Sequence, residues 1–554
     1  MTRYKKIFTW FTAILLAFSV GFITDVNDNY FEISKNLDIF GKLYREINSL
    51  YVDETDPSKL MRTGIDAMLN SLDPYTNYIS EEEVDDLRFM TTGQYGGIGA
   101  LVGKRNGKMI VMEPYEDYPA DEAGIKAGDQ LIRIDGKAIT EEMEVIDVRN
   151  ILRGQKGSQV IVEVSRSGKL QKLQLRRDRI KVDNVPYYGM VNKEVGYISL
   201  TGFTQDAGKE VQMATESLKK KHPRLKGIIL DLRGNPGGRL DEAVNVANVF
   251  VPQKEVIVET RGRMNGTRKS HAARRTATDT EIPLVVLVNH RSASASEIVA
   301  GSIQDLDRGV IVGRRSFGKG LVQNIRPLSY NTQVKVTTAK YYTPSGRCIQ
   351  AINYAERAKD GNVVRIPDSL KNSFQTRNGR TVYDGGGIEP DVVVALPEEK
   401  AVTKALIAQG LIFDFATQFA VETVNLKSPR DFEVSNELYR EFMTYVNERE
   451  FSYDTEADRQ LDKLTETLQE EAYGTELKPQ IDRIEAKLKA AKDQELQKEQ
   501  ARISQLLKEE IIKRYYYKDG VIESRLVDDQ DVSQAVNILT DETRYQAYLA
   551  GSKK

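Results

Sequence analysis

The chain has 554 residues, which at about 150 residues per domain predicts three or four domains. Hydrophobic residues make up 40% and charged residues 29%, so folded cores are expected and wholesale disorder is excluded. The formal net charge of -2 lacks the basic excess of nucleic-acid binders, so no nucleic-acid partner is predicted. The single cysteine, Cys348, excludes an internal disulfide and a cysteine-based zinc site, and no acidic or histidine cluster has ligand spacing. Neither a metal nor another cofactor is therefore predicted.

The first 24 residues differ from the rest of the chain. Arg3, Lys5 and Lys6 precede an apolar run, residues 7–23, that contains no charged residue. This pattern is typical of a signal peptide or a short membrane anchor. We therefore expect an exported protein of the bacterial periplasm, either soluble or anchored to the inner membrane by this segment. A buried helix of a cytosolic domain is the alternative.

Residues 25–90 are expected to form a helical domain. Apolar side chains recur with a helical period between Leu37 and Leu69, and the sequence LDPY at 72–75 then breaks the pattern. A second, short acidic helix is predicted from Glu81 to Phe89.

Short alternating strands punctuated by glycine mark residues 91–180, and one amphipathic helix is expected near residues 145–152. The segment opens with a glycine-rich loop made of Gly96, Gly97, Ile98 and Gly99. A loop of this kind, an edge strand and a helix can accept an extended peptide as an added strand, with its C-terminal carboxylate held by loop amides. These motifs resemble a PDZ domain, and the four loop residues are the predicted substrate-binding element. The alternative is a generic small β domain.

Residues 181–400 alternate apolar runs of strand length with helical segments. The runs lie at residues 196–200, 227–230, 284–288 and 309–313, and helices are expected at 207–220 and 242–250. This alternation predicts an α/β domain with a largely parallel sheet. Active sites of such domains lie in the loops that follow the carboxyl ends of the strands.

Residues 401–554 are rich in charge and helical in pattern. One face carries an apolar stripe made of Ile481, Ile484, Leu488, Leu496, Ile503, Leu506, Leu507, Ile511 and Ile512. The stripe predicts solvated helices with one packed face, and a coiled-coil surface for a second copy or an adaptor is the alternative. The whole chain is thus predicted to be a multidomain α+β protein.

The sequence suggests a possible nucleotide site, because Gly313, Gly318 and Lys319 have the spacing of a phosphate-binding loop. Such a loop needs a serine or threonine after the lysine and a helix beyond it. Gly320 stands where the serine or threonine is needed, and the alternation of apolar and polar residues over 321–327 predicts a strand. Nucleotide binding is therefore excluded.

A candidate nucleophile lies upstream, where a buried strand runs into a helix through small residues. Ser292, Ser294 and Ser296 alternate there with alanine, and small side chains allow close approach of a substrate backbone. The helix N-terminus behind them favours a developing anion. The competing interpretation is that these serines only cap the helix, with Glu297 in its first turn.

A serine nucleophile needs a base. His290 lies at a strand end, His222 precedes a proline in an expected surface loop, and His271 lies in a basic stretch, so a Ser-His pair is disfavoured. A lysine can serve when burial lowers its pKa from about 10.4 towards about 7 to 8. Lys319, between two glycines, is the predicted base.

Several further motifs point to one family. They are SASASEIVAGSIQD, GRRSFGKGLVQ, ILDLRGNPGG, YYTPSGRCIQ, GGGIEPDVVV and SLDPYTNYIS. Together with the PDZ-like segment, in consistent order over residues 36–395, they resemble the carboxy-terminal processing peptidases, or tail-specific proteases. The resemblance implies a crotonase-like protease core and a serine endopeptidase that uses a Ser-Lys dyad on protein or peptide substrates with accessible C-terminal tails.

The resemblance also assigns roles by position. Ser294, the middle serine of its motif, is the implied nucleophile and Lys319 the implied base. Gln323 matches the residue that orients the lysine, and Asp305 matches an acidic position implicated in some members. The proposed oxyanion donors are the amides of Ala295 and Gly237. A catalytically inactive PDZ scaffold on the same fold is the alternative function, and it predicts loss of the nucleophile or the base.

Overall fold

The computed structural model describes residues 24–263, 267–357, 363–395 and 398–550. The predicted signal peptide or anchor therefore lies, except for Thr24, outside the described residues. The chain forms two compact units, of which one holds residues up to Ile79 together with 325–336 and the other holds residues 80–324 and 337–554. In the part of the chain that is described, no helix combines the length and the apolar character needed to cross a bilayer.

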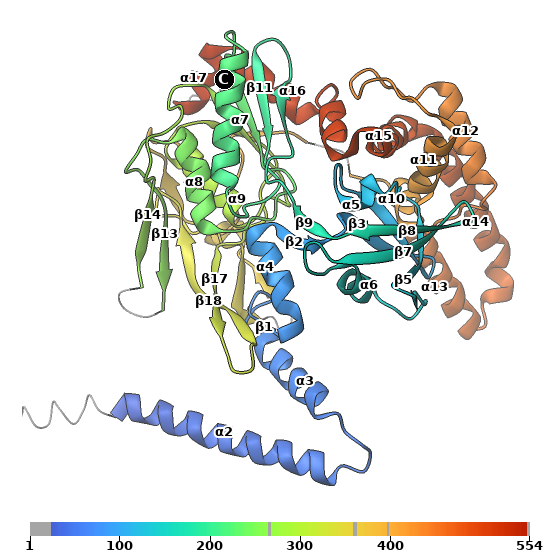
Figure 1. Ribbon diagram of the computed structural model, residues 1–554, viewed down its shortest axis with the longest axis horizontal. Helices are drawn as coiled ribbons and strands as arrows, with labels where there is room; N and C mark the ends of the chain where they lie inside the picture. Colours follow the sequence, from blue (N-terminus) through green and yellow to red (C-terminus); the bar gives the residue numbers. More distant parts are fainter. Residues whose placement is uncertain (1–23, 264–266, 358–362, 396–397, 551–554) are drawn as a thin grey trace, which may run out of the picture. The chain divides into compact units, whose positions relative to one another are not determined.

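The first unit is mainly helical, as predicted (Figure 1). It holds α2 (Thr24–Leu50), α3 (Pro57–Asn70) and the short strand β1 (Asn77–Ile79), which pairs antiparallel with residues 333–335. Asp56 caps α3 by accepting the Lys59 amide at 3.1 Å, and Pro57 fits the first helical position, where no amide hydrogen is needed. The predicted acidic helix forms as α4 (Val84–Thr92), but it belongs to the second unit.

The PDZ-like segment forms an antiparallel sheet. Its strands are β3 (Ala100–Arg105), β4 (Lys108–Pro114), β5 (Gln130–Ile134), β7 (Gln159–Arg166) and β8 (Lys169–Arg176) in this spatial order, with β6 (Lys137–Ala138) paired to β5. The helices are α5 (Pro119–Glu122) and α6 (Val145–Leu152). Alternate strand residues, such as Val160, Val162 and Val164, are fully buried, as period-two patterning requires. A two-stranded ribbon of β2 (Gln94–Gly97) and β9 (Asp178–Lys181) joins the segment to the rest of the unit.

The predicted α/β domain is built on a six-stranded sheet. The strands are β10 (Tyr187–Met190), β11 (Val195–Ser199), β12 (Gly227–Asp231), β15 (Leu284–Val288), β16 (Val310–Gly313) and β23 (Val392–Val393) in this spatial order. Only β10 is antiparallel to its neighbour. Helices α7 (Ala207–Lys221), α8 (Leu240–Phe250) and α9 (Ala295–Asp305) pack on one face, where their apolar residues join Ile198, Leu230 and Val286 in one core. The strands predicted from apolar runs are therefore confirmed.

Further strands lie outside this sheet. They are β13 (Val256–Gly262), β14 (Lys269–Ala272), β17 (Leu321–Pro327) and β18 (Gln333–Tyr342), with the pairs β19 (Ile352–Arg357) and β20 (Val363–Arg365), and β21 (Ser373–Gln375) and β22 (Thr381–Tyr383). The strand β17 begins two residues after Lys319, where a nucleotide-binding loop would need a helix.

The other face of the six-stranded sheet is covered by the end of the chain. Helices α16 (Gln530–Leu539) and α17 (Glu542–Leu549) and the end of α15 (Gln500–Arg525) bury apolar residues against Val195, Ile229 and Val285. Strands of a parallel sheet covered on both faces read as continuous apolar runs, which explains the sequence pattern. The last helices of residues 401–554 therefore complete the core of the α/β domain.

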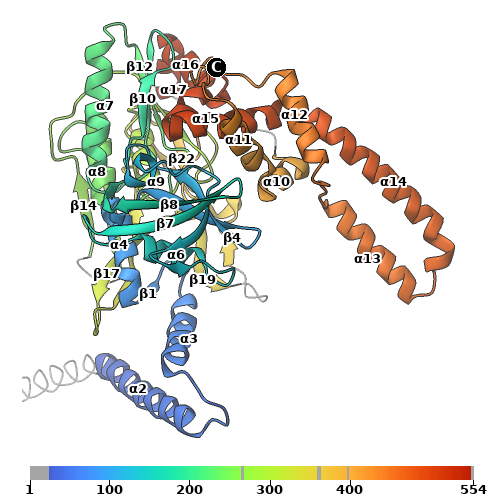
Figure 2. The ribbon, with the colours of Figure 1, turned by 45° about the vertical axis from the view of Figure 1, so that its right-hand side comes forward.

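The remaining C-terminal helices are α10 (Ala401–Ala408), α11 (Leu411–Glu422), α12 (Asn436–Asn447), α13 (Glu456–Glu470) and α14 (Gly474–Lys498). Buried residues of α10, α11, α12 and α15 form a separate core. The second half of the predicted stripe is buried here, with Ile503, Leu507 and Ile511 fully covered. The first half lies on the helical hairpin of α13 and α14 (Figure 2), where Ile484 is 45% exposed.

Candidate active site

Ser294 lies where β15 turns into α9, at the carboxyl end of a central parallel strand. It is the residue before the first helical position, and its backbone has φ 56° and ψ -111°. A positive φ is strained for a residue with a side chain, and such strain concentrates at functional sites. Ser294 is half-buried. The geometry matches the requirement for a nucleophile presented at a sharp strand-to-helix turn.

The two neighbouring serines have structural roles. Ser292 is fully buried and its hydroxyl donates to the Leu232 carbonyl at 2.8 Å. Ser296 is also fully buried and donates to the Asn235 carbonyl at 2.9 Å. Both bonds tie the turn before α9 to the loop after β12. Ser294 is thus the serine of this motif with some access to solvent.

The buried carboxylate of Glu297 joins the Ser294 turn to the Lys319 loop. Its Oε2 accepts the amides of Ser294 at 2.8 Å and of Lys319 at 2.9 Å. Its Oε1 accepts the Gly318 amide at 2.7 Å and the Ser316 hydroxyl at 2.6 Å. Burial raises the pKa of Glu297, whereas the hydrogen bonds from Ser316 and the amides oppose this rise. The two predicted catalytic residues therefore share one acceptor oxygen through their backbones.

A second bridge between the same residues is made by Tyr341 of β18, which is 1% exposed. Its hydroxyl lies within hydrogen-bond distance of the Ser294 carbonyl, at 3.0 Å, and of the Lys319 carbonyl, so its single proton is shared between the two acceptors. Ser294 and Lys319 are thus held together both through their amides and through their carbonyls. The Lys319 side chain is half-buried.

The glycines on either side of Lys319 allow close packing of the backbone. A Cβ atom on Gly318, where φ is 91°, would lie 2.4 Å from the Cβ of Ala351. A Cβ atom on Gly320 would lie 2.8 Å from the Gln350 amide nitrogen. The Ala351 amide donates to the Gly318 carbonyl at 2.9 Å. These glycines fix the loop against residues 350–351, and the strand predicted after the loop is confirmed as β17.

Gly237 lies directly against the Ser294 turn. Its φ is 99°, and a Cβ atom there would lie 2.7 Å from the Ala293 carbonyl oxygen and 2.9 Å from the Ala295 nitrogen. The Gly237 amide donates to Asn235 Oδ1 at 2.9 Å. Among the described residues, no hydrogen bond to the Ala295 amide is found. Of the two predicted oxyanion donors, the Ala295 amide is therefore the one available in this conformation.

Asp305 lies at the opposite end of α9 from Ser294. Eleven helical residues span about 16 Å, so the two residues are not brought together. Asp305 is buried and forms an ion pair with the equally buried Arg347 at 2.8 Å, and it accepts the Ser345 amide at 3.0 Å. These contacts anchor the far end of α9.

Gln323 lies four residues beyond Lys319, in β17. It is half-buried, and its Nε2 donates to Thr337 Oγ1 of β18 at 3.2 Å. This bond fixes the side chain on the strand that leads away from the lysine.

The three histidines are placed apart from this constellation. His290 is exposed, His222 ends α7, and His271 in β14 contacts Thr260 Oγ1 at 3.3 Å. Burial lowers the pKa of His271, and the cationic Arg274 lowers it further. Within the described part of the chain, no hydrogen bond joins a histidine to Ser294.

The glycine-rich loop of the PDZ-like domain leads into an edge strand. The prediction of a four-residue loop is wrong for Gly96 and Gly97, which belong to strand β2 and lie opposite Arg179 and Asp178 of β9. Ile98 is buried, and its carbonyl accepts an amide from α5, whereas Gly99 adopts φ 76° before β3 begins. In the described sheet, β3 has a strand partner on one side only. Its other edge is open to an added strand.

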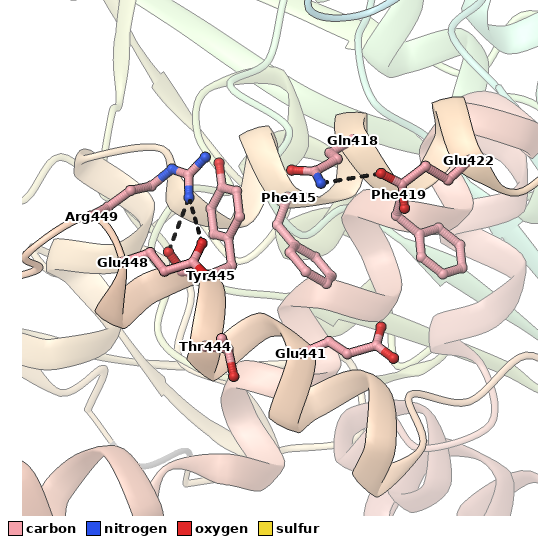
Figure 3. A pocket seen from close by; sticks show the side chains of 9 residues that line it. All are labelled: Phe415, Gln418, Phe419, Glu422, Glu441, Thr444, Tyr445, Glu448 and Arg449. Carbon is pink, nitrogen blue, oxygen red and sulfur yellow. Dashed lines mark hydrogen bonds and ion pairs between the residues drawn. The ribbon is translucent and has the colours of Figure 1, made fainter.

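A cavity of about 470 Å³ lies elsewhere, between α11 and α12 (Figure 3). Aromatic side chains, including Phe415, Phe419 and Tyr445, line it together with Glu422 and Glu441. It contains none of the predicted site residues.

Three segments of the chain match models of known protein families. Residues 194–357 match the model of peptidase family S41, and residues 110–166 match that of the PDZ domain. Residues 402–539 match the C-terminal helical domain of probable PDZ-proteases.

Individual relatives extend the comparison. The carboxy-terminal-processing protease of Bartonella bacilliformis is 40% identical over 348 residues, which cover 62% of this chain and 78% of the relative. The carboxy-terminal processing protease CtpA of Bacillus subtilis is 34% identical over 367 residues, which cover 66% of this chain and 76% of the relative. Among solved structures, the photosystem II D1 C-terminal processing protease is 28% identical, with 65% of this chain and 94% of that chain covered and a TM-score of 0.35.

Proposed function

The chain belongs to the carboxy-terminal processing proteases of peptidase family S41 and is a serine peptidase, and from this premise we propose that it cleaves proteins near their C-termini with a dyad of Ser294 and Lys319. The observation that carries the proposal is the double bridge, in which Glu297 binds both amides and Tyr341 binds both carbonyls of the two residues. The strained turn at Ser294 supports its assignment as nucleophile.

In the proposed reaction, neutral Lys319 takes the proton of the Ser294 hydroxyl while the oxygen attacks the scissile carbonyl carbon. The tetrahedral intermediate collapses to an acyl-enzyme, and the lysine returns the proton to the leaving amine. Water that Lys319 deprotonates then releases the acyl group. Gln323 orients the lysine, and Asp305 acts indirectly by anchoring α9.

The oxyanion of the intermediate needs amide donors, each worth about 3 to 4 kcal/mol in the transition state. We assign the first to Ala295, at the N-terminus of α9. For Gly237 to supply the second, its amide must turn from Asn235 Oδ1 towards the substrate.

Substrate tails are proposed to bind the PDZ-like domain as a strand along the open edge of β3. Main-chain hydrogen bonds to the strand give affinity, and the loop of Gly96, Gly97, Ile98 and Gly99 receives the C-terminal carboxylate. Export to the periplasm remains our proposal from the sequence of residues 1–24, and sequencing the N-terminus of the mature protein tests it.

The dyad is tested with a reporter protein that carries an apolar C-terminal tail. Replacing Ser294 or Lys319 by alanine should each lower kcat by at least about a thousandfold, because the two groups act as one unit. His290→Ala and Ser270→Ala are the matched controls and should retain full activity. Undiminished cleavage by either dyad variant would refute the assignment, and loss of cleavage in His290→Ala would favour a Ser-His pair.

A further inference from the structure

Asp531, near the C-terminus, contacts the loop of the proposed oxyanion donor Gly237 and the loop of the proposed base Lys319. It lies in the first turn of α16 and is 1% exposed. Its Oδ2 accepts Arg233 Nη1 at 2.8 Å and Arg314 Nη2 at 2.7 Å, and its Oδ1 accepts Arg314 Nη1 at 3.1 Å. One carboxylate thus joins two arginines that are about eighty residues apart in the sequence.

The two arginines belong to different active-site loops. Arg233 follows β12 and precedes Gly237 by four residues. Arg314 follows β16 directly and precedes Lys319 by five. The carboxylate therefore lies at the base of both loops, at the carboxyl ends of two strands of the parallel sheet.

The contact consists of ion pairs to a buried carboxylate, so its loss would change the balance of charge at both arginines. Arg233 also pairs with Asp231 at 2.6 Å and with Asp529 at 2.8 Å, but for Arg314 the ion pair described is that with Asp531. The Arg233 and Arg314 side chains are 17% and 23% exposed. Removing one partner of a largely buried pair leaves an uncompensated charge, which the loop relieves by moving towards water.

The position of α16 does not depend on this carboxylate alone. Val532, Ala535 and Ile538 are buried against the sheet together with apolar strand residues. Asp529 caps the helix by accepting the amides of Asp531 and Val532. A change of charge at position 531 can therefore alter the loops while the helix stays docked.

We propose that Asp531 is a positioning residue for the peptidase reaction, and that through Arg233 and Arg314 it holds the Gly237 loop and the Lys319 loop in register. The C-terminal helical region thereby completes the active site. The inference rests on the proposed dyad of Ser294 and Lys319.

The test compares Asp531→Asn with Asp541→Asn in the full chain. Asp541 is the matched control because it caps α17, the next helix, by accepting the Arg544 amide at 3.0 Å, and its described contacts include neither active-site loop. Asp531→Asn should lower kcat by about 10- to 100-fold, since small misplacement of catalytic groups has effects of this size. Its KM for a tailed reporter should stay within about twofold, because the PDZ-like domain is untouched.

A second readout separates positioning from general stability. The rate at which a fluorophosphonate labels Ser294 should fall with kcat in Asp531→Asn at a temperature where circular dichroism shows the protein folded. Unchanged kcat and labelling in the folded variant would overturn the proposal.

Two further variants test the positioning role and the dyad separately. If Asp531→Asn does not fold, Arg314→Gln breaks the same contact from the other side, and it should lower kcat likewise; normal kcat there would overturn the proposal. Cleavage retained by Ser294→Ala would instead refute the proposed dyad, so failure of the dyad and failure of the positioning role are distinguishable.

Discussion

Glu297 accepts four hydrogen bonds from the segments that carry Ser294 and Lys319. Its carboxylate must be ionised so that both oxygens can act as acceptors. Glu297→Gln replaces one acceptor oxygen by an NH2 group that faces donors from the Ser294 and Lys319 loops. A buried donor left without an acceptor costs about 1 to 3 kcal/mol. We expect the free energy of unfolding to fall by about 2 to 4 kcal/mol and kcat to fall by about a hundredfold or more, measured by thermal unfolding and initial rates.

The control for this prediction is Glu242→Gln. Glu242 is a buried glutamate in the first turn of α8, where it accepts the Gly208 amide at 2.9 Å. The control should lose stability but retain the activity of the folded protein. Equal activity of Glu297→Gln and wild type would show that the bridge does not position the dyad.

The sequence predicts candidate site residues, but it does not predict the contacts that the structure shows between them. The positions of Ser294 and Lys319 follow from short motifs in the sequence. The sequence places Glu297 in the first turn of the helix beside the capping serines, a position that needs no partner beyond that turn. Tyr341 occurs in a family motif, but nothing in the sequence indicates that its hydroxyl reaches two carbonyls.

At the scale of elements, the turn between β16 and β17 depends on glycine. Gly318→Ala should lower the free energy of unfolding by about 2 to 4 kcal/mol, because it combines a positive φ with a contact of 2.4 Å to Ala351. Gly379→Ala is the matched control, since φ is 82° there and nothing lies within 4 Å of the added Cβ. The control should lower the free energy of unfolding by about 1 to 2 kcal/mol, which is the effect of the positive φ alone. Equal losses in chemical denaturation would show that the contact relaxes freely.

A strong hydrophobic period in the sequence predicts a helix or a strand, but it does not predict the surface against which that element packs. Five apolar residues in a row at 284–288 indicate a central strand because both faces of it are covered. Val532, Ala535 and Ile538 form an equally regular stripe in α16, but a stripe does not identify the surface that covers it. The sequence therefore predicts a packed face on the C-terminal helices without its partner, which for α16 is the protease sheet.

At the scale of the whole second unit, the PDZ-like domain is held from two sides. The β2–β9 ribbon joins it to the protease domain, where Lys181 of β9 pairs with Glu210 of α7 at 2.8 Å, and polar contacts join it to the C-terminal helices. These contacts include Arg105 with Asp414, Glu113 with Lys513 at 2.8 Å, and Asp121 with Tyr517 at 2.7 Å. Tyr517 makes its contact from a kink in α15, where its φ is 49°. No charge pattern in the sequence identifies such pairs, which join residues about 300 to 400 positions apart.

Arg105 is the strongest of these contacts because it binds both Asp414 oxygens, at 2.7 and 3.0 Å, and packs over the Phe413 ring. It ends β3, the strand to which a substrate tail is proposed to add. Arg105→Gln should weaken the contact by about 1.5 to 3 kcal/mol, so transient separation of the domain becomes at least about tenfold more frequent. Hydrogen exchange of the amides in residues 100–114 measures this directly.

The neighbouring residue supplies the comparison. Lys104 pairs with Glu144 at 2.9 Å inside the PDZ-like domain, so Lys104→Gln removes the same charge from the same strand without touching the C-terminal helices. Exchange should rise in Arg105→Gln and stay near the wild-type rate in Lys104→Gln. If the exchange rates rise equally in both variants, local fraying of β3 causes the exchange. Loss of the contact between the domains would raise the exchange rate in Arg105→Gln only.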